Sequence, residues 1–110
     1  MTISWDDFLQ VDIRVGEIVK VEDFPEARKP AYKISVNFGD ELGVKTSSAQ
    51  ATNYSKTELL GMQVACVVNF PAKRIASVVS EVLILGVPGE DNQVSLLTPS
   101  KKALLNGRAY

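Results

Sequence analysis

Residues 11–21 read VDIRVGEIVKV, and this stretch decides the fold. Apolar side chains occupy alternate positions on both sides of Gly16, which is the period of a half-buried β-strand. A glycine allows a strand to bend or bulge, so that one long strand serves two parts of a sheet. A small closed barrel requires such a strand. The alternating residues are Val11, Ile13, Val15, Val19 and Val21.

The segments that follow in the chain also read as short strands. Residues 31–38 alternate apolar Tyr32, Ile34, Val36 and Phe38 with polar neighbours, which predicts one buried side and one solvated side. Residues 42–50 alternate less clearly, and residues 62–70, 81–87 and 93–99 read as buried strands. Turn signals recur about every ten residues, which is typical of a small all-β domain.

The loop after residue 38 determines which side chains of the next strand share a face with the preceding one. A three-residue loop over residues 39–41 would place apolar residues opposite apolar residues, and we therefore expect it. This register sets Ser35 opposite Lys45 and Lys33 opposite Ser47. It predicts a solvent-facing surface of alternating ammonium and hydroxyl groups.

Two short helices complete the predicted fold. Ser4 and Asp7 have the spacing of a capping box, and Ser55 with Glu58 repeats it before Gly61 ends the turn. The sequence thus predicts an all-β, five-stranded OB-fold barrel, with one short N-terminal helix and a second between strands three and four. The 110 residues suit a single domain spanning 1–110. OB-folds usually bind oligonucleotides or oligosaccharides on strands two and three.

The composition argues against most enzyme classes. There is no histidine, which removes imidazole acid–base schemes and histidine metal ligands, and the one cysteine, Cys66, lies in an apolar run as a buried thiol. We expect no catalysis, no cofactor and no metal site. Residues 1–10 lack the positive and apolar segments of a signal peptide, and no run reaches membrane-spanning length, so we expect a soluble, cytoplasmic protein.

Positive charge is concentrated in the middle of the chain. The net charge is −1, yet residues 27–80 carry seven Lys or Arg against three Asp or Glu. We expect a Pro71-braced loop between strands four and five to reach the same side of the barrel as the strand two–three hairpin. Six cations and two hydroxyls would then converge on phosphate groups, unless they are ordinary solvated side chains. These residues are Arg28, Lys29, Lys33, Lys45, Ser47, Ser48, Lys73 and Arg74.

Aromatic side chains for base stacking are scarce. Tyr32 and Phe38 point inward by alternation, and Phe70 ends a predicted buried strand. Tyr54, beside the second helix, is either a free stacking residue or a packing residue at the helix terminus. This pattern favours recognition of a folded RNA through its backbone and shape.

The N-terminal helix would carry an apolar patch of Trp5, Phe8 and Leu9. A barrel of this size has little surface to cover the patch, so either a second copy covers it in a homodimer or the helix plugs the end of the barrel.

Three motifs in order carry a family resemblance: residues 7–39, the segment KTSSAQ at 45–50, and NFPAKRIASVVSEVLILG at 69–86. They resemble the CsaA-type tRNA-binding-domain proteins, stand-alone relatives of a domain appended to some methionyl- and phenylalanyl-tRNA synthetases. The resemblance implies an OB-fold homodimer that binds tRNA without catalysis, and a proposed chaperone role in protein export. By motif match it adds Ser80 to the candidate RNA-binding residues. The competing class is therefore a chaperone that binds unfolded polypeptides through apolar surface.

Overall fold

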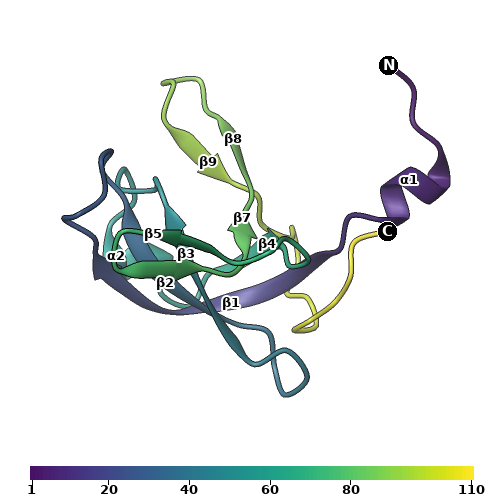
Figure 1. Ribbon diagram of the computed structural model, residues 1–110, viewed down its shortest axis with the longest axis horizontal. Helices are drawn as coiled ribbons and strands as arrows, with labels where there is room; N and C mark the ends of the chain where they lie inside the picture. The colour runs from purple at the N-terminus through teal and green to yellow at the C-terminus, as the bar shows by residue number, and fades with distance from the viewer.

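The long strand β1 (Ile13–Asp23) organises the sheet, as the sequence predicts (Figure 1). Its first half, Ile13–Glu17, pairs with β4 (Gln63–Val67), and its second half, Glu17–Asp23, pairs with β2 (Tyr32–Asn37). Gly16 lies where the two halves meet, and a Cβ there would stand 2.4 Å from Cγ1 of Val36. The close packing thus excludes a side chain at this position. The bulge itself lies further along the strand, where the register with β2 shifts between Ile18 and Lys20. The prediction that Val19 lies on the apolar side is therefore wrong, since Ile18 is buried and Val19 is 42% exposed.

The computed structural model describes residues 1–110. The main sheet has the order β3-β2-β1-β4-β7 and forms a nearly closed antiparallel barrel, which confirms the predicted fold class. The sheet closes where the backbone N–H of Glu81 donates to the carbonyl oxygen of Thr46 at 2.8 Å. The remaining elements are α1 (Trp5–Leu9), β3 (Val44–Ala49), α2 (Lys56–Leu59), β5 (Lys73–Ile75), β6 (Val78–Ser80), β7 (Leu83–Ile84), β8 (Gly86–Pro88) and β9 (Val94–Leu96).

Both predicted capping boxes are present. Ser4 and Asp7 exchange side-chain and backbone hydrogen bonds at the start of α1, and Ser55 and Glu58 do the same at α2. These contacts satisfy amide groups that a first helical turn leaves unpaired. No helix in the structure has the length and apolar character needed to cross a membrane.

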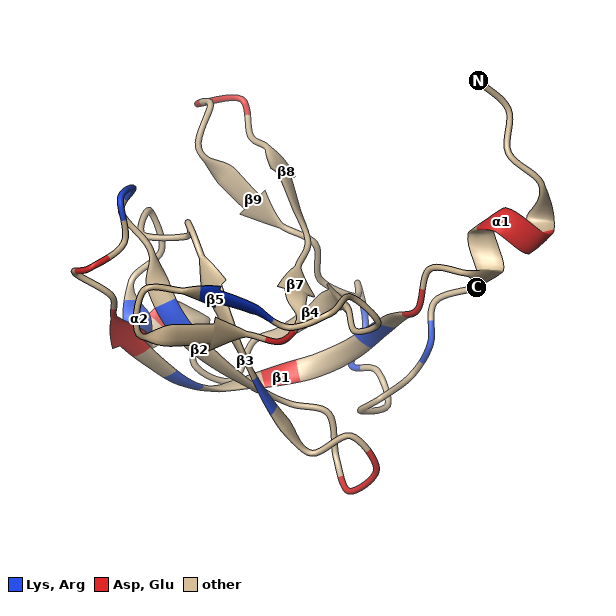
Figure 2. Cartoon of the chain, viewed as in Figure 1, with Lys and Arg blue, Asp and Glu red and all other residues tan.

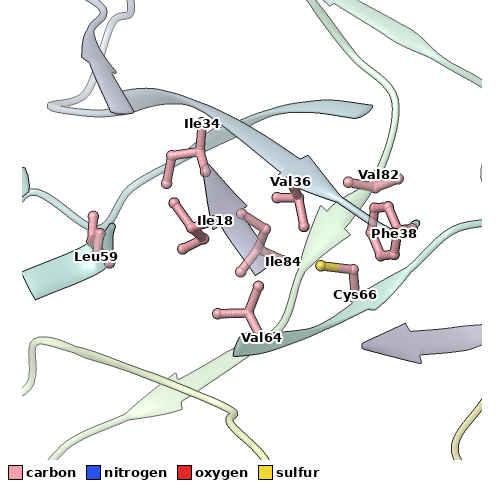
Figure 3. Packing of buried hydrophobic residues seen from close by; sticks show 9 residues of the cluster. All are labelled: Ile18, Ile34, Val36, Phe38, Leu59, Val64, Cys66, Val82 and Ile84. Atoms are coloured by element: carbon pink, nitrogen blue, oxygen red, sulfur yellow. The ribbon is translucent and has the colours of Figure 1, made fainter. Parts of the chain in front are cut away.

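The core lies inside the barrel, where side chains from four strands, α2 and the adjoining segments point toward one another (Figure 3). The inward positions predicted for β2 are confirmed at Ile34, Val36 and Phe38, each with no exposed surface. The complete cluster is Ile18, Ile34, Val36, Phe38, Leu59, Val64, Cys66, Val82 and Ile84.

The predicted register of β2 and β3 is wrong by one residue. The loop has four residues, 39–42, because the N–H of Phe38 donates to the carbonyl oxygen of Gly43 at 3.0 Å. Gly39 and Gly43 both have positive φ, 90° and 72°, a conformation that favours glycine and makes the longer loop possible. Lys33 therefore pairs with Ser48, and Ser35 with Thr46.

This shift exchanges the two faces of β3, because side chains alternate along a strand. Ser47 pairs with Ile34, faces inward and is 1% exposed, whereas Thr46 and Ser48 take the outward positions. Lys45 pairs with Val36, so it does not share the outer face with Lys33 as predicted. The outer surface carries hydroxyl groups on β3 but no lysine.

The predicted loop between strands four and five is in part a β-hairpin. β5 and β6 pair with each other, and a two-residue turn at Ala76 and Ser77 joins them. Ala76 adopts a φ of 51°, which a non-glycine residue rarely does. The turn residues are Ala and Ser, so the sequence lacks the Asn-Gly or Asp-Gly signal that marks a two-residue hairpin turn. The last predicted strands are present, although the first of them is divided into β7 and β8.

Candidate nucleic-acid interface

A row of polar side chains crosses four neighbouring strands on the outside of the barrel. Lys33 on β2 pairs with Ser48 on β3, and Lys73 on β5 pairs with Ser80 on β6. The backbone N–H of Ser48 donates to Oγ of Ser80 at 3.4 Å, which joins the two halves of the row. Since adjacent strands lie about 4.8 Å apart, the row runs about 14 Å with a lysine at each end.

Half of the twelve Lys and Arg side chains lie beside a carboxylate, and the other half do not. Lys33 lies 4.0 Å from Glu22, Lys45 lies 3.9 Å from Glu81, and Lys56 lies 3.0 Å from Asp23. Six cations make no ion pair, and they occur as three adjacent couples. These are Arg28 with Lys29, Lys73 with Arg74, and Lys101 with Lys102.

The first two couples belong to segments that pack together. A small second core of Phe24, Ala31 and Val78 holds residues 24–31 against the β5–β6 hairpin, and Ala27 and Ile75 pack on it. Figure 2 shows positive charge on β5 and at the tip of the loop between β1 and β2. The sequence places these couples more than forty residues apart, and the second core brings the segments that carry them into contact.

Two predicted contact residues do not face the row. The hydroxyl of Ser47 lies inside the barrel, and its hydrogen bond, at 3.5 Å, goes to the carbonyl oxygen of Ser48. Lys45 points toward Glu81, whose Oε1 also accepts a hydrogen bond from the N–H of Thr46 at 3.1 Å. The structure thus brings together Lys33, Ser48, Lys73, Arg74 and Ser80, with Arg28 and Lys29 on the adjoining loop.

A hollow of about 760 Å³ adjoins this row at β5 and β6. Its lining includes Ser48, Lys73, Arg74 and Ser80, together with Phe70, which is 56% exposed. The prediction that Phe70 ends a buried strand is wrong, because β4 stops at Val67 and the chain turns before Pro71. The proline itself was the available signal, since it has no N–H to donate to a neighbouring strand and is rarely found inside a central strand.

Tyr54 is a packing residue, which settles the alternative left open by the sequence. It packs against the core, its hydroxyl accepts a hydrogen bond from the N–H of Leu96 at 3.0 Å, and its carbonyl oxygen accepts one from the hydroxyl of Tyr32 at 2.9 Å. A ring held in this way offers no face to a base.

The groups with shifted pKa values lie away from the row. The hydrogen bond from Arg14, at 2.6 Å, holds the pKa of Asp12 below its usual value, with a further contribution from Arg108. Burial raises the pKa of Cys66 to about 12, so this thiol is neutral and unreactive at physiological pH. No three side chains of the types His, Cys, Asp and Glu gather as a metal-binding group.

The helix α1 projects from the barrel instead of plugging it (Figure 1). Trp5 is 65% exposed and Leu9 is 44% exposed, while the rings of Trp5 and Phe8 contact each other at a tilt of 43°, with their centroids 5.4 Å apart. The alternative in which this helix closes the end of the barrel is therefore wrong. Its apolar side is available for contact with another surface.

The chain is similar to a known family of domains and to parts of longer proteins. A model described as a putative tRNA-binding domain matches residues 13–107. Methionine–tRNA ligase of Pyrococcus abyssi is 36% identical over 109 residues, which are 98% of this chain and 14% of that relative; the ligase of Thermococcus onnurineus is 33% identical over 106 residues, with 96% and 14% covered. The chain thus spans a small part of the curated relatives it matches.

Among solved structures, two described as chaperone CsaA proteins are similar throughout. The one from Picrophilus torridus is 50% identical with a TM-score of 0.93, covering 99% of this chain and 100% of its own. The one from Bacillus anthracis is 42% identical with a TM-score of 0.91, and both chains are fully covered.

Proposed function

The chain belongs to the family of putative tRNA-binding domains, and we propose that it binds tRNA in the cytoplasm, without catalysis, through the outer row and its flanking cations. The contacts would come from Lys33, Ser48, Ser80, Lys73, Arg74, Arg28 and Lys29. Lys45 and Ser47 are left out of this face because of the observed register.

The observation that carries the proposal is the grouping of cations without ion pairs. Four of the six such cations lie on two segments joined by the second core, beside a row of hydroxyl groups. A cation without a carboxylate partner is free to neutralise a phosphate, which releases counterions, and hydroxyls donate to phosphate oxygens. Because phosphates are the same in every sequence, this surface favours backbone recognition of a folded RNA.

A tRNA titration at several salt concentrations tests the proposal. Lys33→Ala and Lys73→Ala are each expected to weaken binding and to lower the slope of log affinity against log salt by about one. Lys56→Ala is the matched control, because Lys56 lies on α2 outside the row and its ammonium is held 3.0 Å from Asp23, closer than the 4.0 Å between Lys33 and Glu22. Its slope should equal that of the unchanged chain. Absence of tRNA binding at low salt would overturn the proposal.

We infer a homodimer from the exposed apolar side of α1. A short helix that buries none of its residues in its own barrel is marginal unless another surface packs against it, and Trp5, Phe8 and Leu9 provide the contact. Two copies would double the cationic surface presented to one RNA. Sedimentation should give a dimer at micromolar concentration, and Trp5→Ala should shift it toward monomer; a monomeric unchanged chain would contradict the dimer.

The second candidate function is binding of unfolded polypeptides. Its support is an uncharged hollow of about 850 Å³ between residues 48–53 and the β8–β9 hairpin, where Val87 is 45% exposed. Apolar capture keeps or gains strength as salt rises, whereas phosphate contacts weaken steeply. An unfolded polypeptide that binds independently of salt, with no tRNA binding, would favour this function over the first.

A further inference from the structure

Phe70 is an exposed aromatic residue whose two neighbours in the chain, Asn69 and Pro71, restrict its backbone. The side chain of the preceding Asn69 accepts a hydrogen bond from the N–H of Asp12 at 3.0 Å and donates one to the carbonyl oxygen of Gln10 at 2.7 Å. Pro71 restricts the backbone on the other side of the ring. An aromatic group held in this way loses little conformational entropy when a ligand packs on it.

The surroundings of Phe70 have two chemically different ends. On one side is the hollow of about 760 Å³ that contains Lys73 and Arg74. On the other is a smaller hollow of about 200 Å³ that contains Lys45, and Glu81, which lines both hollows, lies 3.9 Å from that lysine. Phe70 lines both hollows, and so does the buried Val82, which contributes apolar surface between them.

This arrangement fits the parts of one nucleotide. Every base has a π-face that stacks on an aromatic ring, and the phosphate attached to it needs a cation. Lys73 and Arg74 are exposed and make no ion pair, whereas Lys45 at the other end lies beside Glu81. The cations that are free to pair with a phosphate therefore lie at one end only. An apolar peptide side chain would contact Phe70 but would leave both cations without a partner, so charge complementarity favours the nucleotide.

We propose that this site holds one unpaired nucleotide of the bound RNA, with its base stacked on Phe70 and its phosphate at Lys73 and Arg74. The proposal rests on the tRNA-binding function proposed above and adds that the RNA must present a base outside a duplex. Binding through the outer row alone would make no distinction between paired and unpaired RNA.

The first test compares two ligands of equal length, a single-stranded RNA oligonucleotide and the same strand in a blunt duplex. Phe70→Ala is expected to weaken binding of the single strand about 5- to 100-fold, which is the usual effect of losing one stacked base, with an unchanged salt slope. Lys73→Ala should instead change the salt dependence, lowering the slope of log affinity against log salt by about one. The duplex should bind the unchanged chain and Phe70→Ala with equal affinity.

Two further substitutions at the same position separate stacking from apolar contact. Phe70→Leu keeps apolar bulk without a π-face, so it should lose affinity as Phe70→Ala does, while Phe70→Trp should keep it. The chain has one tryptophan, Trp5, so Phe70→Trp with Trp5→Phe places a single fluorophore in the hollow. Its emission should be quenched when the single strand binds.

The outcomes are distinguishable. If tRNA does not bind the unchanged chain at low salt, the proposed function fails. If tRNA and the single strand bind but Phe70→Ala and Phe70→Leu bind them equally well, only the nucleotide site is overturned. The nucleotide site is also overturned if Phe70→Leu retains full affinity, or if Phe70→Ala loses binding of reduced, carboxymethylated α-lactalbumin while keeping RNA affinity. Thermal melts of each variant should match the unchanged chain, since Phe70 is exposed.

Discussion

Replacing Gly16 with alanine tests the close packing at the point where β1 passes from pairing with β4 to pairing with β2. The added Cβ would lie 2.4 Å from Cγ1 of Val36 and 2.9 Å from Cε1 of Phe38. Ordinary carbon–carbon contacts lie at about 3.5–4.0 Å, so the overlap is about 1 Å. Val36 and Phe38 have no exposed surface and therefore have no solvent-filled space into which to move.

Two opposing effects determine how much Gly16→Ala lowers the free energy of unfolding. Overpacking a well-packed core costs about 1–3 kcal/mol, and an overlap of this size belongs in the upper part of that range, about 2.5 kcal/mol. Removing a glycine from a strand returns about 0.5 kcal/mol of backbone entropy, so the net loss is about 2 kcal/mol. With 110 residues and an unfolding entropy of about 2.1 cal/mol/K per residue, the melting temperature should fall by about 9 °C.

A double-mutant cycle measured by calorimetry distinguishes a local clash from a general loss of stability. Val36→Ala removes the methyl group that the added Cβ would meet, and it should cost about 2 kcal/mol by itself. In the double variant with Gly16→Ala, the loss in free energy of unfolding should be smaller than the sum of the two single losses by about 1 kcal/mol or more. A melting temperature unchanged by Gly16→Ala, or strictly additive losses in the double variant, would refute the packing argument.

Three further predictions concern single side chains. Ser48→Ala should weaken tRNA binding about 2- to 10-fold by removing one hydrogen bond, whereas Ser47→Ala should leave it unchanged in fluorescence anisotropy; equal losses would contradict the register. Because Arg14 holds the pKa of Asp12 below its usual value, the stabilisation it gives is present above about pH 4 and is lost as pH falls through the lowered pKa. Asp12→Asn should therefore lower the free energy of unfolding by about 1 kcal/mol at pH 7 and weaken the pH dependence of stability below about pH 4; parallel melting profiles would contradict this. Burial raises the pKa of Cys66 to about 12, so its thiol should react with Ellman's reagent at pH 8 only after urea unfolds the chain, and rapid reaction of the folded protein would disprove its burial.

The features predicted correctly are those fixed within a few residues of sequence. The capping boxes at Ser4 and Ser55 depend on partners three residues away, and the faces of β2 follow from its own alternation. The length of β1 as a single strand follows from its apolar run, although its bulge lies between Ile18 and Lys20 and not at Gly16. In each case local chemistry and the final fold favour the same structure.

The errors have a different physical origin, because they depend on loops and distant contacts. Apolar alternation favoured a three-residue loop, and only the positive φ of Gly39 and Gly43 establishes the longer one. Exposure of Phe70 follows from the early end of β4, which no apolar pattern marks. The second core joins residues 24–31 to Val78, a contact between segments whose separation in sequence gives no periodic signal.

The predicted polar surface is present in the structure although the predicted register of β3 is wrong, because its lysine and its hydroxyl are positioned by different strands. The outward position of Lys33 is set by alternation within β2, and a shift of β3 leaves it unchanged. The same shift exchanges Ser47 for Ser48, so a hydroxyl still lies opposite Lys33, whereas Lys45 turns toward Glu81. The β3 strand therefore contributes a hydroxyl but no charge. Attraction for phosphate must then come mainly from residues 24–31 and the β5–β6 hairpin, so loosening the second core should weaken RNA binding even though its side chains contact no RNA.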